Sequence, residues 1–156
     1  MFDENLVFLD IEAHTYEEVL KFSYDHLQKM NFVENEYLNS ILQREKVFPT
    51  GLKTHVGIDV AIPHTEAEFA RKEVVVFIRT KQYVRFNHMV DPDEEVFTRL
   101  IFNIVVKNPK KQVVFLTKFM KVFQNKELLT FLSTEIDKKK IIDALSKEFN
   151  LQEGSK

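Results

Sequence analysis

The chain has 156 residues, of which 44% are hydrophobic and 29% are charged, proportions that suit one α/β-sized domain with a core of its own. Its formal net charge is −2, with lysine and arginine scattered among acidic residues, so it offers no basic surface to a phosphodiester backbone and nucleic-acid binding is not expected. The absence of cysteine excludes disulfide bonds, a thiol nucleophile and thiolate metal sites within this chain.

No targeting or membrane segment is visible in the sequence. The opening MFDE lacks the basic region and the apolar run of a secretory signal, and no run of about 18 apolar residues occurs. We therefore expect a cytoplasmic protein that does not insert into a membrane.

Two helices are predicted in the first third of the chain. The sequence TYEE at residues 15–18 matches a capping box and predicts a helix from Thr15 to about Met30. A second helix is expected from about Asn35 to the turn-forming sequence PTG at residues 49–51. The apolar residues expected to face the core are Tyr16, Val19, Leu20, Leu27 and Met30 in the first helix, and Tyr37, Leu38, Ile41 and Leu42 in the second.

The middle of the chain is predicted to form strands. Residues 57–62 indicate a short strand, and the longer apolar runs at 73–80 and 99–106 are typical of strands covered on both faces. Alternation at residues 83–86 favours a separate edge strand, and the sequence DPD at residues 91–93 predicts a turn.

The last third is predicted to be helical. Asn108 and Pro109 form a cap and first-turn pair, which predicts a helix to about Gln124 with Val113, Leu116, Met120 and Phe123 on one side. Asp137 is a candidate cap for a last helix that carries Ile141, Ile142, Leu145 and Phe149. The expected fold is a three-layer α/β sandwich, a mixed sheet with helices on both faces. We expect a single domain over residues 1–150 and a frayed tail over 151–156.

The most informative motif is GIDVAIPHTEA at residues 57–67, because it places a histidine directly after a strand and a proline. Pro63 favours an extended conformation at Ile62, so Ile62 should end the strand and His64 should begin the loop, presented to solvent. Imidazole is a nucleophile and a good leaving group near pH 7. The ring also needs an orienting hydrogen bond, whose partner the sequence does not identify. A surface histidine that merely follows a strand end fits the same pattern.

This motif and several others resemble a known family. EKVFPTGL at residues 45–52 and GIDVAIPHTEA at 57–67 are similar to the active-site region of mannitol/fructose-type enzyme IIA domains of the sugar phosphotransferase system. The similarity continues through FNHM at 86–89, DPD at 91–93 and NPKKQ at 108–112, and is greatest to the galactitol-type branch. The resemblance implies a three-layer α/β fold and a phosphohistidine carried on His64.

The resemblance also implies two protein partners. Phosphate would come from the carrier protein HPr and pass to an enzyme IIB domain for sugar uptake, with membrane association only through the IIB/IIC transporter. No cofactor is expected beyond the phosphoryl group carried covalently on His64. Two alternatives remain open: a regulatory enzyme IIA-like module that reports phosphorylation state to a regulator, and a non-catalytic binding domain on the same fold.

Arg44 is the candidate for electrostatic stabilisation of the phosphoryl group. It lies three residues after Ile41, on the flank of the buried face of the second helix, and its planar fork suits bidentate contact with phosphate. The resemblance places this arginine beside the active histidine. An alternative role for Arg44 is that of a cation at a helix C-terminus, and its neighbour Glu45 is expected to be a solvated helix-end residue.

The other candidate residues carry weaker signals. His55 and His88 are expected to be loop histidines, and Lys111 a solvated first-turn lysine, although assistance from His55 or Lys111 at the phosphoryl site remains open. No metal is expected, because spacings such as His-x-x-x-His are missing. Three glycines, at positions 51, 57 and 154, form no phosphate-binding loop, so no nucleotide is expected either. Phe69 is predicted to be core, with a role in docking partners as the alternative.

Overall fold

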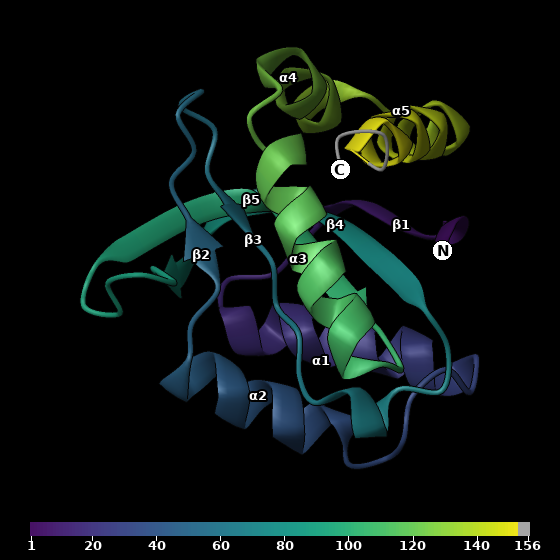
Figure 1. Ribbon diagram of the computed structural model, residues 1–156. Helices are drawn as coiled ribbons and strands as arrows, with labels where there is room; N and C mark the ends of the chain where they lie inside the picture. The colour runs from purple at the N-terminus through teal and green to yellow at the C-terminus, as the bar shows by residue number, and fades with distance from the viewer. Residues whose placement is uncertain (153–156) are drawn as a thin grey trace.

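A computed structural model of the chain describes residues 1–152, which form a mixed β-sheet between two layers of helices (Figure 1). The expected three-layer α/β sandwich is confirmed. In chain order the elements are β1 (Phe2–Ile11), α1 (Tyr16–Lys29), α2 (Tyr37–Val47), β2 (Gly51–Leu52), β3 (Val60–Ala61), the short 3₁₀ helix η1 (Ala67–Phe69), β4 (Val74–Asn87), β5 (Glu95–Val105), α3 (Pro109–Val122), α4 (Lys126–Thr134) and α5 (Lys138–Leu151).

The sheet has the strand order β1-β4-β5-β3-β2. The β1/β4 and β3/β5 pairs are parallel, whereas β4/β5 and β2/β3 are antiparallel. Each face has its own apolar core. Helices α3, α4 and α5 pack on one face over residues such as Phe102, and α1 and α2 pack on the other over residues such as Ile101. Burial of each such side chain contributes about 1.5–3 kcal/mol.

The helix starts predicted from capping residues are confirmed. They were predictable because a cap bonds to backbone groups only two or three residues away. The Thr15 hydroxyl accepts a hydrogen bond from the Glu18 amide at 3.2 Å, and the Glu18 carboxylate accepts from the His14 amide at 3.1 Å. The side chains of Asn108 and Asp137 cap α3 and α5 in the same way.

Two expectations for the strands were wrong. Strand β1 was not predicted, and it lies parallel to β4 with Leu6 in one core and Val7 in the other, so both sides of the strand are buried. Residues 83–86 are not a separate edge strand. They continue β4 past a register shift and pair with β5, where Val84 lies opposite Thr98. The DPD sequence lies in the connection between these two strands, as expected.

Two further elements differ in extent or orientation. The strand expected over residues 57–62 is limited to Val60–Ala61, because Gly57 at φ 83° belongs to a turn that precedes it. In α3 the buried face carries Phe115, Phe119 and Val122, whereas Val113, predicted to face inward, is 64% exposed.

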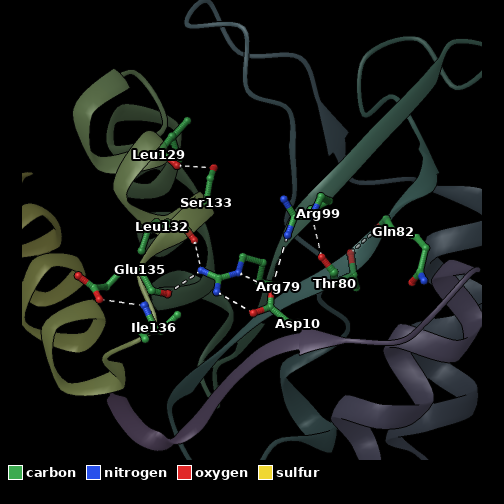
Figure 2. Close-up of polar contacts among 10 residues, drawn as sticks. All are labelled: Asp10, Arg79, Thr80, Gln82, Arg99, Leu129, Leu132, Ser133, Glu135 and Ile136. Carbon is green, nitrogen blue, oxygen red and sulfur yellow. Dashed lines mark hydrogen bonds and ion pairs between the residues drawn. The ribbon is translucent and has the colours of Figure 1, made fainter.

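A buried arginine of β4 holds β1, β4 and α4 together (Figure 2). Arg79, which is 2% exposed, donates to both carboxylate oxygens of Asp10 at 3.0 and 3.1 Å. It also donates to the carbonyls of Leu132 and Glu135, at 2.9 and 2.7 Å, at the C-terminal end of α4. The guanidinium thereby satisfies helix-end carbonyls that would otherwise lack donors.

Within residues 1–152, no helix is both long and apolar enough to span a bilayer. Helix α5 extends to Leu151 with Gln152 as its C-cap, so residues 151 and 152 of the predicted tail belong to this helix and its cap. The rest of that predicted tail, residues 153–156, lies outside the described residues. The assignment of residues 1–150 to a single domain stays a prediction.

Candidate functional site

The loop that follows β3 is fixed to the centre of the sheet through Pro63. The Pro63 carbonyl accepts hydrogen bonds from the Ile104 amide at 3.0 Å and from the side-chain amide of Asn103 at 3.2 Å. Asn103 is fully buried, and it also donates to the Tyr37 hydroxyl at 2.9 Å and accepts from the Ser23 hydroxyl at 2.6 Å. This buried polar network, in which every member has a partner, sets the position of the residue that follows Pro63.

His64 is oriented by the backbone of its own loop. Its Nδ1 lies 2.8 Å from the carbonyl oxygen of Ile62. Because a carbonyl can only accept, Nδ1 carries the proton, and the lone pair of the neutral ring is on Nε2. Ile62 is in turn held by its amide, which donates to the Thr50 carbonyl at 3.1 Å. The orienting partner that the sequence did not identify is therefore the Ile62 carbonyl.

His64 is much less exposed than expected. Only 6% of the residue is accessible, so the prediction of a fully presented loop histidine was wrong, because the ring turns back onto the strand end. Among residues 1–152 the buried side-chain nitrogen and oxygen atoms without a partner are Arg44 Nε and Gln82 Oε1. Nε2 of His64 also has no hydrogen-bond partner. Since it is not among the buried atoms that lack one, Nε2 must be accessible to solvent.

The environment keeps this imidazole neutral. Burial lowers the pKa of His64, and the nearby Arg44 charge lowers it further, against the opposing effects of the Ile62 bond and Glu66. A neutral ring with its lone pair on an accessible Nε2 is a competent nucleophile near pH 7.

Arg44 lies in the last turn of α2 and is turned toward the His64 loop. Its Nη1 donates to Glu66 Oε1 at 3.2 Å, its guanidinium lies 5.4 Å from the centre of the Phe48 ring, and its buried Nε has no acceptor. Arg44 thus lies close enough to His64 for its charge to lower the pKa of the ring, and its Nε–H still lacks an acceptor.

Glu66 connects α2 to the loop, and sequence reasoning did not single it out. Its Oε2 accepts from the Ser40 hydroxyl at 3.0 Å and from the Thr65 hydroxyl at 2.8 Å, while Oε1 accepts from Arg44. The only sequence signal for this residue is its position two places after His64, since the contacts with α2 are not local.

The N-terminal turn of α3 reaches the same loop through Gln112. Its side-chain amide donates to the Thr65 carbonyl at 2.7 Å. Lys111, one residue earlier, pairs instead with Glu73 at 3.2 Å and is solvent-accessible, in agreement with a first-turn lysine outside the reacting centre. The NPKKQ sequence pointed to this turn but not to the residue that makes the contact.

Glu45 contradicts the expectation of a solvated residue. It is 4% exposed, and its carboxylate accepts from the amide and the hydroxyl of Thr50, at 2.7 and 2.8 Å. Burial raises the pKa of Glu45 to about 7, although both Thr50 bonds lower it. The helix ends two residues later, and the chain folds back over its last turn, which a helical pattern does not predict.

The remaining histidines lie elsewhere. His55 is exposed, and the His88 ring accepts from the amides of Val90 and Asp91 in the connection between β4 and β5. His26 packs against the rings of Phe8 and Phe22, which also contact each other. No group of three or more potential ligands gathers at metal-binding distance within the described part of the chain.

Comparison with known proteins assigns the family. Residues 1–148 match the family model "Phosphoenolpyruvate-dependent sugar phosphotransferase system, EIIA 2". The chain belongs to this family. It is 28% identical over 150 residues to the mannitol-specific EIICBA component of Escherichia coli K12, which covers 94% of this chain and 20% of that relative. It is also 29% identical over 119 residues to the galactitol-specific EIIA component of Escherichia coli O6:H1, covering 75% and 77% of the two chains.

The chain therefore spans about a fifth of the length of the mannitol-specific relative. Among solved structures, it is similar to the crystal structure of IIA mannitol from Escherichia coli, with a TM-score of 0.68 and 26% identity over 94% of this chain and 97% of that chain. A complex of enzyme IIA mannitol and phosphorylated enzyme IIB mannitol from the same species matches with a TM-score of 0.69 and 27% identity, over 96% and 99% of the two chains.

Proposed function

We propose that the chain is a phosphohistidine carrier of a sugar phosphotransferase system, with His64 as the residue that is phosphorylated. The observation that carries this proposal is the bond from His64 Nδ1 to the Ile62 carbonyl, which leaves an accessible lone pair on Nε2. Membership of the EIIA family supports the same chemistry. In this proposal the phosphoryl group is carried covalently, and no cofactor or metal takes part.

The reaction is a transfer of one phosphoryl group between two histidines. The Nε2 lone pair of His64 attacks the phosphorus of phospho-HPr, the new N–P bond forms, and the HPr imidazole leaves with the electron pair of the broken bond. The phospho-HPr ring reacts with its other nitrogen protonated, so that its imidazole leaves as a neutral group. His64 keeps its Nδ1 hydrogen and takes over the positive charge as a phosphorylated imidazolium. Arg44 stabilises the charge on the phosphoryl oxygens during the transfer. In a second transfer, a nucleophilic side chain of an enzyme IIB domain attacks the phosphorus, the N–P bond to His64 breaks, and the His64 imidazole leaves as the neutral ring.

The surroundings of the site support docking by protein partners. Val47 and Phe48, which are 52% and 63% exposed, lie at the end of α2 and line a shallow pocket together with Arg44 and Glu66. Val113 and Val114 of α3 are also exposed, next to the Gln112 contact with the loop. Phe69 is half-buried and packs against the core, so these residues rather than Phe69 are proposed as the docking surface.

The IIB partner is supported by the relative that was solved in complex with phosphorylated IIB mannitol. HPr as the donor is part of this proposal, and membership of the phosphotransferase family supports it. Both partners must reach the same Nε2 edge, so we expect weak and mutually exclusive binding through small interfaces. A cytoplasmic location is proposed because both partners would be met there, with any membrane association made through IIB and IIC.

The decisive experiment is phosphorylation by phosphoenolpyruvate, enzyme I and HPr, followed by mapping of the modified residue. One acid-labile, alkali-stable phosphoryl group on His64 is expected, and modification of any other residue refutes the proposal. The informative variant is His64→Gln rather than His64→Ala, because alanine would leave a gap where a buried ring packs. The glutamine variant should fold and accept no phosphoryl group.

Transfer to IIB separates transport from a regulatory role. Loss of label from His64 and its appearance on an added IIB protein supports the transport function. A phosphohistidine that no IIB protein discharges favours a regulatory module instead.

A further inference from the structure

The role of Glu66 is the strongest unexplained feature of the site. Its carboxylate binds three donors from two separate parts of the chain: Ser40 and Arg44 of α2, and Thr65 of the loop. Half of the Glu66 side chain is nevertheless exposed, so the carboxylate lies at the surface rather than in the core, and it is close enough to His64 to affect the pKa of that ring. Among residues 1–152, Glu66 is the carboxylate that pairs with Arg44.

Arg44 is only partly satisfied by this carboxylate. Glu66 accepts from Nη1, whereas the Arg44 Nε is buried and has no acceptor. A buried donor without a partner is costly, and guanidinium groups bind phosphate best through two parallel N–H bonds. The resting arginine therefore has one donor that no acceptor satisfies, and this donor becomes available to a second anion when the guanidinium moves.

We propose that Glu66 is the resting counterion of Arg44, and that Arg44 exchanges this carboxylate for the phosphoryl oxygens when His64 is phosphorylated. The inference rests on the proposed function of His64. In the resting state the Arg44–Glu66 pair is neutral and holds the guanidinium beside the loop. In the phosphorylated state the phosphoryl dianion and the carboxylate compete for the same cation.

Glu66 can release Arg44 without losing its own position. The hydroxyls of Ser40 and Thr65 continue to donate to Oε2 after the arginine has moved. The pKa of Glu66 is lowered, chiefly by the hydrogen bond from the Thr65 hydroxyl, so the carboxylate stays ionised at neutral pH. A fixed negative charge then repels the phosphoryl group on His64 and favours its onward transfer.

The first test is the equilibrium of phosphoryl exchange between HPr and the chain, measured with Glu66→Gln. The amide keeps the shape of the side chain and an acceptor for Ser40 and Thr65, but it removes the competing charge. We expect the equilibrium to shift toward the phosphorylated chain by roughly threefold to tenfold. The matched control is Glu68→Gln, which removes an exposed carboxylate two residues away and should leave the equilibrium unchanged.

The second test observes the exchange directly in the full chain. The Nε–Hε NMR signal of Arg44 should move downfield on phosphorylation, because a buried donor without a partner gains a phosphoryl acceptor. The Nη1 signal should also move, because Nη1 gives up its bond to Glu66, whereas a role of Glu66 confined to folding would keep this bond and leave the Nη1 signal unmoved.

The outcomes separate this inference from the proposed function. Suppose that the wild-type chain accepts phosphate on His64. If Glu66→Gln then leaves the equilibrium unchanged, shifts it toward phospho-HPr or shifts it no more than Glu68→Gln does, the counterion role is refuted and the proposed function of His64 stands. An Arg44 signal that does not respond to phosphorylation refutes it as well. If the wild-type chain accepts no phosphate on His64, the proposed function itself fails.

Discussion

Replacing Glu45 with glutamine should change how the stability of the protein depends on pH. Burial raises the pKa of this carboxyl from its ordinary value of 4.5 to about 7 in the folded chain. Between these two values the unfolded chain has released the proton while the folded chain retains it. Because the folded state binds more protons, the free energy of unfolding falls as pH rises through this window.

The size of the effect follows from the two pKa values. At about 1.4 kcal/mol for each pH unit, moving the pKa from 4.5 to about 7 corresponds to about 3 kcal/mol, which is present below pH 4.5 and lost as pH rises through about 7. Glutamine fits the same place, since its oxygen can accept from the Thr50 amide while its nitrogen donates to a rotated Thr50 hydroxyl. The variant therefore removes the titration and keeps both bonds.

Urea unfolding followed by circular dichroism at pH 5 and pH 8 measures this effect. The stability of Glu45→Gln relative to the wild type should rise by about 2–3 kcal/mol from pH 5 to pH 8. Glu36→Gln, an exposed carboxylate at the start of the same helix, serves as the control and should show little change. A stability difference between Glu45→Gln and the wild type that does not vary with pH would refute the reasoning.

Two further substitutions test Arg44 of α2 and Arg79 of β4. Arg44→Lys keeps the charge but loses the fork geometry, so rapid-quench kinetics should show phosphoryl transfer slowed by ~10-fold or more, and a rate within twofold of wild type would return Arg44 to the role of a helix-end cation. Arg79→Met leaves the α4 carbonyls and Asp10 without their buried donor. It should lower the free energy of unfolding by about 2–4 kcal/mol in urea titrations while the folded variant transfers phosphate normally, and a loss under about 1 kcal/mol would contradict this assignment.

Local chemistry made part of this structure predictable from the sequence. The caps at Thr15, Asn108 and Asp137 were identified correctly because each bond joins residues two or three positions apart. The proline before His64 ends the extended segment for a reason confined to neighbouring residues. The two long apolar runs indicated strands covered on both faces, and β4 and β5 do lie in the middle of the sheet.

Register and strand order required long-range contacts that periodicity does not encode. The paired residues of β1 and β4 lie 69 to 73 positions apart in the sequence, and nothing in the residues of β1 specifies that partner. The face that α3 buries depends on where α5 and the sheet lie, which is why Phe115 and Phe119 rather than Val113 enter the core.

The sequence by itself determined the reactive residue type, its place after a strand and a proline, and the family resemblance. Only the tertiary structure decided that the His64 ring is buried with Nε2 outward, that Glu45 is enclosed, and that Arg44 meets Glu66 from 22 residues away. The physical reason is that burial and ion pairing depend on what packs over a residue. In this protein the neighbours that cover and pair the site come from α2, β5 and α3, which are distant in sequence from the loop.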